Sequence, residues 1–390
     1  MNGTEFASTR APAAKAVSRM SDPKTILDAT LTVVLAGGDG KRLLPLTAER
    51  PKPAVPIGGP FKLIDFTLSN CFNSGLRRLF LLTQYKSEPL HCYIRDGWSA
   101  LWNRPNGNPH EYIVCLPPAC GKHYRGTADA IFQNLQIITR EDPKFILVLS
   151  SDHVYRMDYT ELLESHANSG ASVTIAQVRQ PSNRGSRVVN MGVYAFTTRA
   201  LVRALAEDAE RVTNHDLESD IIPRLIQTGA VSAYSWQLYW RGIRTIDSYY
   251  ESNIELAQAK PPFDPYTTET WPIRAGDFGV LHPSDLVLPV AKGVSNSVIS
   301  PGVYIADDAE VDRCIVMAGA IIGKGVRVRR TIIEEGVEIL PGSEIGFDRL
   351  KDRARYRMSE NGVVIVTAKS AGMAIGVGSG PVQNHLSSAQ

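Results

Sequence analysis

The sequence predicts two consecutive fold types, an α/β domain with a βαβ sheet followed by a parallel β-helix. From Leu31 to about Leu256, apolar strand-like runs alternate with helical patterns, which is typical of a sheet covered by helices on both faces. From Val298 to Ile345 the pattern changes, because apolar residues recur at every fifth or sixth position. A chain of 390 residues is also long for a single hydrophobic core.

The first domain is predicted from runs of ordinary strand and helix length. The strand-like runs include 31–35, 78–82, 145–149 and 173–176, and the helical patterns include 128–138 and 198–206. Ligands of such folds bind beyond the carboxyl ends of the strands, and a glycine-rich turn follows the first run there. Glycines let backbone N–H groups approach phosphate oxygens closely. We therefore expect a Rossmann-like domain with a phosphate-binding turn after its first strand.

A repeat of 17 residues defines the second domain. Eight apolar residues follow one another at intervals of 5 or 6, namely Ile305, Val311, Val316, Ile322, Val328, Ile333, Ile339 and Ile345. Gly302, Gly319 and Gly336 are also 17 residues apart. A β-sandwich would show strict period-two alternation instead. The spacing therefore predicts the three-sided coils of a left-handed parallel β-helix domain.

The composition divides the chain into five segments. We expect a disordered N-terminal extension at 1–28, the α/β domain at 29–260, a linker rich in Pro and aromatic residues at 261–289, the β-helix domain at 290–370, and a Gly/Ser-rich disordered tail at 371–390. The extension has the composition of a transit peptide but a poor amphipathic pattern. A translation start at Met20 is a third interpretation of this segment.

Charge, hydropathy and cysteine usage exclude several protein classes. A formal net charge of +2 gives no reason to expect a nucleic-acid partner, and the absence of 18 consecutive apolar residues predicts no membrane span. The five cysteines are scattered without the spacing of a zinc site, which is typical of a reduced environment. We therefore expect a cytoplasmic protein with no nucleic-acid or membrane partner.

The residues after the glycine-rich turn form a long motif. It contains Arg50-Pro51-Lys52-Pro53-Ala54-Val55-Pro56, then Gly58-Gly59 and Leu63-Ile64-Asp65-Phe66, and a later string reads Tyr124-Arg125-Gly126-Thr127-Ala128-Asp129-Ala130. Over roughly residues 31–368, the chain resembles the ADP-glucose pyrophosphorylase (glucose-1-phosphate adenylyltransferase) family. The resemblance implies a nucleotidyltransferase domain that forms ADP-glucose and pyrophosphate from ATP and glucose 1-phosphate, for glycogen- or starch-type glucan synthesis.

The resemblance also implies three catalytic residues. Arg42 and Lys52 match family positions that contact the triphosphate and the departing pyrophosphate, where negative charge develops. Asp152 follows the strand-like run 145–149, and a carboxylate at a strand end can hold Mg²⁺ against phosphate oxygens. The family pattern there is Gly-Asp-His, so Ser151 departs from it while Asp152 is retained. We interpret His153 as a packing residue.

Eight further positions match nucleotide-binding residues of the family. Gln84 matches a glutamine that contacts adenine. At Gly126 and Thr127, backbone groups would contact the edge of the adenine ring. These residues lie at the positive end of a helix that starts there. The full set is Leu35, Ala36, Gly37, Gly38, Gln84, Tyr124, Gly126 and Thr127.

Regulation and assembly are implied by the resemblance as well. Arg50 and Lys62 match basic positions of a cleft between the two domains that binds phosphorylated allosteric effectors, and Arg330 is a candidate from the β-helix side. Because family members are usually tetramers, we expect a homotetramer, or a hetero-oligomer with an active paralogue. The coils contain no His that could act as an acyltransferase base, which favours a structural or regulatory role for the β-helix.

Two departures from the family pattern weaken the expected activity. In the family, a Glu-Lys-Pro motif precedes the Ser-Met-Gly sequence, and its Lys binds the sugar phosphate. This chain lacks that motif, because Asn190-Met191-Gly192 follows soon after Pro181, and Asn190 stands in place of the Ser. Where the family reads Trp-Arg-Asp-Val-Gly-Thr, this chain reads Trp240-Arg241-Gly242-Ile243-Arg244-Thr245. Gly242 thus replaces the Asp that serves the family as second metal ligand, which makes Asp247 the first replacement to consider. The alternative hypothesis is a catalytically impaired regulatory subunit that binds ATP or effectors. A pyrophosphorylase for another sugar or base is a third.

Overall fold

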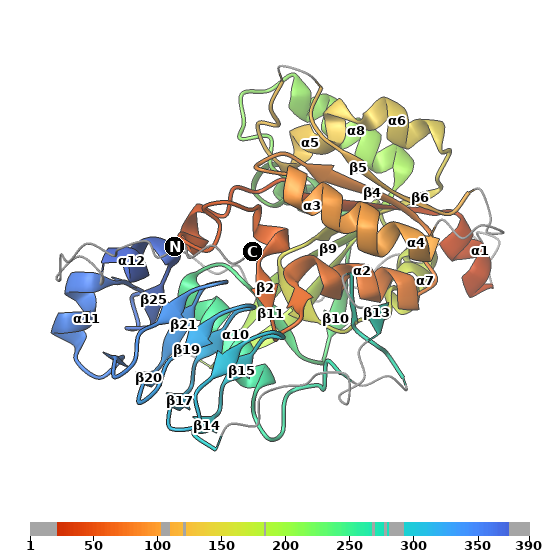
Figure 1. Cartoon of the computed structure of the whole chain (residues 1–390). Coiled ribbons are helices and arrows are strands. Elements are labelled where there is room, and N and C mark those ends of the chain that lie inside the picture. Colours follow the sequence, from red (N-terminus) through yellow and green to blue (C-terminus); the bar gives the residue numbers. More distant parts are fainter. Residues whose placement is uncertain are drawn as a thin grey trace, which may run out of the picture.

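The computed structural model describes residues 22–102, 110–119, 122–182, 185–266, 270–276, 279–280 and 292–373. An α/β domain and a C-terminal β-helix lie side by side, with the β-helix at the lower left of Figure 1. Both predicted fold types are confirmed. No helix in these ranges is long and apolar enough to cross a membrane.

The α/β domain is built on a sheet of seven strands. They are β1 (Thr30–Ala36), β4 (Arg78–Thr83), β5 (Tyr112–Leu116), β6 (Phe145–Ser150), β8 (Val173–Ser182), β9 (Gly185–Thr197) and β10 (Val231–Trp236). Their order across the sheet is β10-β8-β9-β6-β1-β4-β5. The sheet is mixed, because β9 runs antiparallel to β6 and β8 while the other neighbours pair in parallel. All four strand-like runs predicted from the sequence lie within these strands.

Helices cover both faces of the sheet (Figure 1). One face carries α1 (Pro23–Asp28), α2 (Leu63–Asn73), α3 (Glu88–Tyr93), α4 (Ser99–Trp102) and α7 (Tyr159–Ser169), and the other carries α5 (Thr127–Gln133), α6 (Leu135–Arg140), α8 (Thr198–Ala209) and α9 (Ile222–Gln227). Side chains of β1 alternate between the two apolar layers, with Leu31 and Val33 on the α5 side and Val34 and Ala36 on the α2 side.

Two helical segments differ from the sequence prediction. The helix expected at 128–138 is divided at Asn134, whose side-chain amide donates to Ala130 O (2.9 Å) and to Tyr124 Oη (2.9 Å). α1 lies inside the segment 1–28 that the composition assigns to a disordered extension. Its first turn is capped by Asp22, which accepts from Lys24 N–H (3.2 Å). The helix predicted at 198–206 is confirmed by α8.

Short elements at the carboxyl edge of the sheet position the residues of interest. The 3₁₀ turns η1 (Lys41–Leu43) and η2 (Lys52–Ala54) follow the glycine-rich turn, and β7 (His153–Tyr155) follows β6. β7 pairs antiparallel with β11 (Trp240–Gly242), which leads into α10 (Ile246–Leu256). The remaining elements of this domain are β2 (Pro56–Ile57), β3 (Phe61–Lys62), η3 (Ile94–Trp98) and η4 (Leu217–Ile221). The segment expected to be a linker contains the antiparallel pair β12 (Arg274–Ala275) and β13 (Gly279–Val280).

The β-helix consists of short strands that stack into three sheets. The first sheet contains β14 (Val294–Ser295), β17 (Glu310–Asp312), β20 (Arg327–Arg329) and β23 (Glu344–Ile345). The second sheet contains β15 (Val298–Ile299), β18 (Ile315–Val316), β21 (Thr331–Ile333), β25 (Val364–Val366) and β24 (Arg357–Met358). The third sheet contains β16 (Tyr304–Ile305), β19 (Ile321–Ile322) and β22 (Glu338–Ile339). Successive coils pair in parallel at 17-residue intervals, as Val311 with Val328 and Val328 with Ile345. All eight apolar residues of the predicted repeat are buried. Two helices complete this region, α11 (Arg349–Arg355) and α12 (Ala368–Met373).

An apolar cluster joins the two domains. It includes Ile246, Tyr249 and Tyr250 of α10 together with Val298, Ile315 and Ile332 of the β-helix. The Tyr250 hydroxyl donates to Arg313 O (2.8 Å), and the Ser300 hydroxyl donates to Gly59 O (3.0 Å). α10 therefore connects the β11 side of the α/β domain to the β-helix.

Candidate active site

The glycine-rich turn after β1 contains two glycines with different surroundings. Gly40 has φ +61°, and a Cβ there would lie 2.8 Å from Thr47 Cγ2. At Gly38, in contrast, a Cβ would meet nothing within 4 Å. Gly40 therefore fixes the course of the turn, while the backbone at Gly38 faces open space that a ligand can occupy.

A pocket of about 590 Å³ lies beside this turn, at the carboxyl ends of β1 and β6. That volume is within the usual range for small-molecule sites. Ten predicted catalytic and nucleotide-binding residues line it, namely Leu35, Gly37, Gly38, Arg42, Lys52, Gln84, Tyr124, Gly126, Thr127 and Asp152. The remaining one, Ala36, is buried in the core on the α2 side of the sheet.

Gln84, Tyr124 and Gly126 form one wall of the pocket. The Tyr124 N–H donates to Gln84 Oε1 (2.5 Å), which ties two segments that are 40 residues apart. A Cβ at Gly126 would lie 2.3 Å from Asn214 O and 2.4 Å from His215 O. Glycine is therefore required at this position by the close approach of another backbone segment.

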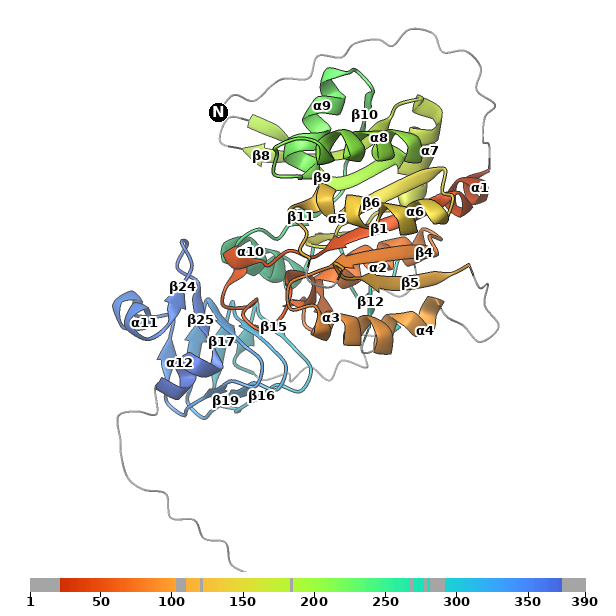
Figure 2. The ribbon, with the colours of Figure 1, turned by 90° about the horizontal axis from the view of Figure 1, so that it is seen from above.

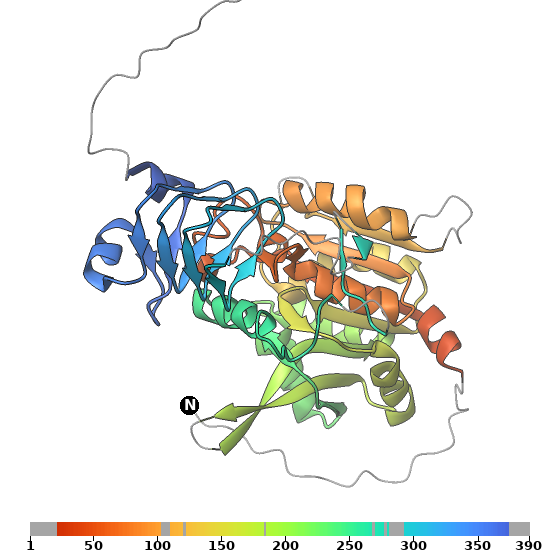
Figure 3. The ribbon, with the colours of Figure 1, turned by 60° about the horizontal axis from the view of Figure 1, so that its bottom comes forward.

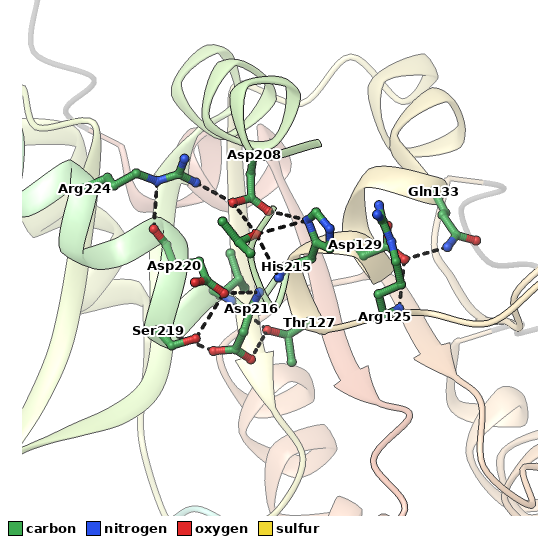
Figure 4. Close-up of polar contacts among 12 residues, drawn as sticks. Arg125, Thr127, Asp129, Gln133, Asp208, His215, Asp216, Ser219, Asp220 and Arg224 are labelled. Atoms are coloured by element: carbon green, nitrogen blue, oxygen red, sulfur yellow. Dashed lines mark hydrogen bonds and ion pairs between the residues drawn. The ribbon is translucent and has the colours of Figure 1, made fainter. Parts of the chain in front are cut away.

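Buried polar contacts hold the segment that meets this wall (Figure 4). His215 Nδ1 lies 2.9 Å from Asp208 Oδ2, and Arg224 donates to Asp208 Oδ1 (2.7 Å). The His215 carbonyl oxygen accepts from the N–H groups of Ala128 (2.8 Å) and Asp129 (3.2 Å), at the start of α5. These two N–H groups at the start of α5 therefore donate to a carbonyl of the same chain. The prediction that the positive end of α5 faces the nucleotide is wrong for them.

Asp216 is a pocket residue whose place there the sequence did not reveal. It accepts a hydrogen bond from the Thr127 hydroxyl (2.8 Å), as Figure 4 shows, and lines the pocket beside that threonine. Its other oxygen accepts from Glu218 N–H (3.0 Å) and Ser219 N–H (2.9 Å) as the N-cap of η4. The available signal in the sequence was an Asp at a position where a helix could start.

The charged groups of the pocket meet at Asp152. Lys52 Nζ forms an ion pair with Asp152 Oδ2, and His153 Nε2 lies 3.1 Å from Asp152 Oδ1. Burial raises the pKa of Asp152, but the positive charges of protonated His153, Lys52 and Arg244 outweigh this effect and lower the pKa to about 2. Burial lowers the pKa of His153 to about 4, so its ring is neutral at pH 7. The His153 ring also contacts the Trp240 ring (4.7 Å between centroids), as expected for a packing residue.

One carboxylate is present where the family pattern implies two metal ligands. Asp152 lines the pocket, but Gly242 has no side chain. Asp247 faces the C-terminal region, where it accepts from the Ser359 hydroxyl (2.5 Å) and from Asn361 N–H (3.4 Å), so the idea that it replaces the missing ligand is wrong. Within the described ranges, no group of three or more His, Cys, Asp or Glu side chains is arranged to hold a metal ion. A divalent ion would need phosphate oxygens of a bound nucleotide to complete its coordination.

Arg244 is a second pocket residue that sequence reasoning missed. It lies two positions after Gly242, is exposed, and lines the pocket. The signal was a new cation within the altered Trp240–Thr245 motif, close to the lost carboxylate. Further lining residues outside the predicted set are Asp39, Gly40, Lys41, Leu43, Pro53, Leu82, Ala130, Ser150 and Ser151.

The three predicted effector-binding residues lie outside this pocket. Each has its own contact: Arg50 forms two hydrogen bonds with Glu335 (3.0 and 2.6 Å), Lys62 Nζ lies 3.3 Å from the ring centroid of Tyr93, and Arg330 donates to Asn361 O (3.1 Å). The Arg50 pair crosses between the two domains. An anionic effector at Arg50 would have to compete with the Glu335 carboxylate.

The predicted loss of a segment after Pro181 corresponds to a tight hairpin. β8 and β9 pair up to Ser182 and Gly185, so only two residues connect the strands. The outer halves of these strands project from the sheet as a two-stranded ribbon (Figure 2, Figure 3). At the inner end, the Asn190 side chain donates to the Tyr194 hydroxyl (2.8 Å) and accepts from Gly192 N–H (2.9 Å).

Comparisons with known proteins match both domains. A family model described as "Nucleotidyl transferase" matches residues 31–187 and 178–259, and one described as "GlmU-like, C-terminal hexapeptide" matches residues 287–366. "Glucose-1-phosphate adenylyltransferase 2" of Vibrio cholerae is 39% identical over 400 aligned positions, which cover 86% of this chain and 97% of that protein. "Glucose-1-phosphate adenylyltransferase" of Koribacter versatilis is 36% identical (87% of this chain, 95% of that protein). The protein of the same name from Corynebacterium jeikeium is 36% identical (86% and 97%).

The same comparisons reveal missing residues. Because 86% of 390 residues is about 335, about 65 of the 400 positions aligned with the Vibrio cholerae protein have no counterpart in this chain. The nucleotidyl transferase match is also split into two parts that overlap at 178–187, where the β8–β9 hairpin turns. This chain therefore lacks residues that its relative has, and the split match indicates the hairpin as one place where they are lost.

Proposed function

The chain belongs to the glucose-1-phosphate adenylyltransferase family, and we propose that it binds ATP and glucose 1-phosphate in the 590 Å³ pocket and forms ADP-glucose and pyrophosphate. One observation carries the proposal. The glycine-rich turn, the Lys52–Asp152 ion pair and the Gln84–Tyr124 wall come from distant parts of the sequence and line one pocket.

ATP is proposed to bind along the turn and the wall. Its adenine would contact Gln84, Tyr124 and Gly126, whose positions are fixed by the backbone contacts described above. Its phosphates would follow the open backbone at Gly38 toward Arg42. The other nucleotide-binding positions proposed from the family resemblance are Leu35, Ala36, Gly37 and Thr127; of these, Ala36 could contribute only its backbone, because its side chain is buried.

The proposed chemistry is an in-line displacement at the α-phosphorus. An oxygen of the sugar phosphate forms a bond to this phosphorus, the bond to the β-phosphate bridging oxygen breaks, and its electron pair leaves with pyrophosphate. Arg42 and Lys52 would neutralise the charge that grows on the leaving group. The pocket holds both reactants in one orientation, which removes the entropic cost of their encounter from the chemical step.

Nucleotidyltransferases typically use a divalent metal, and we propose Mg²⁺ for this chain. Asp152 is its proposed protein ligand, because the low pKa keeps this carboxylate ionised throughout the physiological range. A bound Mg²⁺ would withdraw charge from phosphate oxygens. Since Lys52 already pairs with Asp152, we expect the metal to bind weakly without nucleotide.

The second candidate function is a catalytically impaired regulatory subunit that binds ATP or effectors. Two observations favour it, the short β8–β9 hairpin, at which the family match is split into two parts, and the glycine at position 242. Loss of a charged group that stabilises a transition state commonly costs about 3 to 4 kcal/mol. We therefore expect turnover by the isolated chain to be slower than the ordinary enzyme range of about 1–10³ s⁻¹.

Assembly and regulation remain proposals. We propose a homotetramer, or a hetero-oligomer with an active paralogue, because the exposed side chains of Tyr304 and Ile321 on neighbouring coils offer apolar surface. Phosphorylated effectors are proposed to act through Arg50, Lys62 and Arg330. The domain limits of 29–260 and 290–370, with a linker at 261–289, and a cytoplasmic location are likewise proposed.

Titration calorimetry with ATP tests the nucleotide part of the proposal. Wild type should bind ATP in the presence of Mg²⁺, and Arg42→Ala should weaken binding roughly tenfold, as expected for loss of a charge-assisted hydrogen bond. Arg203→Ala is a matched control, because Arg203 lies on α8 and pairs there with Glu207 (3.8 Å). Failure of the wild type to bind ATP would refute the proposal.

A further inference from the structure

We propose that Arg244 binds the phosphate group of the sugar phosphate, and so supplies a positive charge that this chain lost with its Glu-Lys-Pro segment. The inference rests on the proposed function, because it assigns one residue to the second substrate of the same reaction. It concerns a residue that distinguishes this chain from the family pattern, where a Gly occupies the position of Arg244.

Arg244 is one of two unpaired cations in the pocket. The lining residues include four cations and three carboxylates: Lys41, Arg42, Lys52 and Arg244, and Asp39, Asp152 and Asp216. Lys41 pairs with Asp39 (2.8 Å) and Lys52 pairs with Asp152. The side chains of Arg42 and Arg244 form no hydrogen bond or ion pair with any residue that the structure describes. Both guanidinium groups can therefore form direct hydrogen bonds to a bound anion, while the charge of Arg244 also acts on Asp152.

The backbone fixes where the Arg244 side chain begins. Gly242 pairs with His153 across β11 and β7, and Ile243 N–H donates to Asp152 O (3.0 Å). Arg244 N–H then donates to Ser248 Oγ (2.9 Å), within the capping box that starts α10. Because its backbone is held on both sides, only the side chain must be ordered when an anion binds, which lowers the entropic cost of binding.

Gly242 keeps this guanidinium free. A Cβ at this position would lie 3.0 Å from Trp240 Cη2 and 3.4 Å from His153 Cδ2, so a larger side chain would crowd both rings. An aspartate would also place a carboxylate two residues from Arg244, where the two groups could pair. The Gly242 and Arg244 substitutions therefore act together, since the first removes a competing anion and the second adds a cation.

The position of Arg244 favours the sugar phosphate over the nucleotide. Arg42 lies in η1, directly after the glycine-rich turn, which is the side proposed for the ATP phosphates. Arg244 instead follows β11, whose partner strand β7 begins directly after Asp152. Arg244 therefore lies beside Asp152, on a segment separate from the turn proposed for the ATP phosphates, and is the cation left for the second substrate.

Binding measurements with each substrate test this inference. Glucose 1-phosphate is titrated into the full chain saturated with Mg²⁺ and a non-hydrolysable ATP analogue, and ATP is titrated separately. The variants are Arg244→Ala, Arg244→Lys and the control Arg241→Ala. Arg241 carries the same charge three residues earlier, pairs with Glu251 and Glu255, and does not line the pocket. Thermal melting verifies that each variant is folded.

We expect Arg244→Ala to weaken glucose 1-phosphate binding by roughly ten- to hundredfold and ATP binding by less than about threefold. Arg244→Lys should recover part of the loss, and Arg241→Ala should bind like the wild type. The inference is overturned if Arg244→Ala leaves glucose 1-phosphate binding unchanged, or if ATP binding falls instead. A wild type that binds ATP but not glucose 1-phosphate also overturns it, whereas a wild type that binds neither refutes the proposed function itself.

Discussion

Replacing Gly126 with alanine should damage the fold and the nucleotide wall together. The added methyl group would lie 2.3 Å from Asn214 O and 2.4 Å from His215 O, and both are backbone atoms that cannot rotate away. The segments must separate by roughly 1 Å to reach the 3.3 Å of a close C···O contact. The residue itself is extended, so the effect is steric and does not arise from φ.

The cost can be estimated from the contacts that must stretch. Overpacking of this kind costs about 1–3 kcal/mol. The His215 carbonyl would also lose its short hydrogen bonds from Ala128 N–H and Asp129 N–H, each worth about 1 kcal/mol. We therefore expect Gly126→Ala to lower the free energy of unfolding by about 3–5 kcal/mol. Because Tyr124 and Thr127 move with the displaced segment, ATP affinity should fall at least roughly tenfold.

Urea unfolding and ATP titration measure the two effects. Gly38→Ala is the matched control for stability, because the same methyl group at that position meets nothing within 4 Å. It should change the free energy of unfolding by less than about 0.5 kcal/mol. A Gly126→Ala protein as stable as the Gly38→Ala protein would refute the reasoning, since it would mean that the 126 and 214–215 segments are not in close contact.

Three further predictions follow from individual contacts. Gly38→Ala should weaken ATP binding roughly tenfold in calorimetry, because a Cβ would keep phosphate oxygens away from the backbone; unchanged affinity would show that the phosphates do not approach this glycine. Burial lowers the pKa of His166 to about 4, below its usual 6.5, so its contribution to stability is present above pH 6.5 and is lost as the pH falls through 4. Of the stability that urea titrations show to be lost between pH 7 and pH 5, about 2 kcal/mol should therefore be absent from a His166→Gln variant, and a variant with the same pH dependence as the wild type would contradict this assignment. The Arg50–Glu335 pair is about one-third exposed, so a double-mutant cycle should give a coupling below about 1 kcal/mol. If Arg50 also binds anionic effectors, Glu335→Gln should increase effector affinity, whereas a decrease would place the effectors elsewhere.

Local sequence patterns were sufficient for the strands, the coils and most of the pocket. Apolar runs such as 145–149 predicted β6 because a buried strand needs both faces apolar, and the 17-residue spacing predicted the coils because each coil repeats the same inward positions. The pocket residues were found because they lie in contiguous motifs. Lys52 and Asp152 were each predicted on this basis, although their ion pair joins residues 100 positions apart.

The features that were missed depend on contacts between distant segments. Nothing near residue 127 in the sequence reveals that the His215 carbonyl caps the start of α5. Asp247 looked like a replacement ligand because of its distance along the chain from Gly242, but the α10 helix turns it toward Ser359. The break at Asn134 arises because its amide bonds to Ala130 O and Tyr124 Oη, which competes with continuation of the helix.

Product formation by the purified chain alone tests the central claim most directly. ATP, glucose 1-phosphate and Mg²⁺ are incubated with the chain, and ADP-glucose and pyrophosphate are quantified against a Lys52→Met variant. We predict equal amounts of the two products, formed at less than about 1 s⁻¹. The variant should give no product above background, because the charge that grows on the leaving pyrophosphate loses the Lys52 cation. Bound ATP without any ADP-glucose above the Lys52→Met background would contradict the claim that this pocket transfers the adenylyl group.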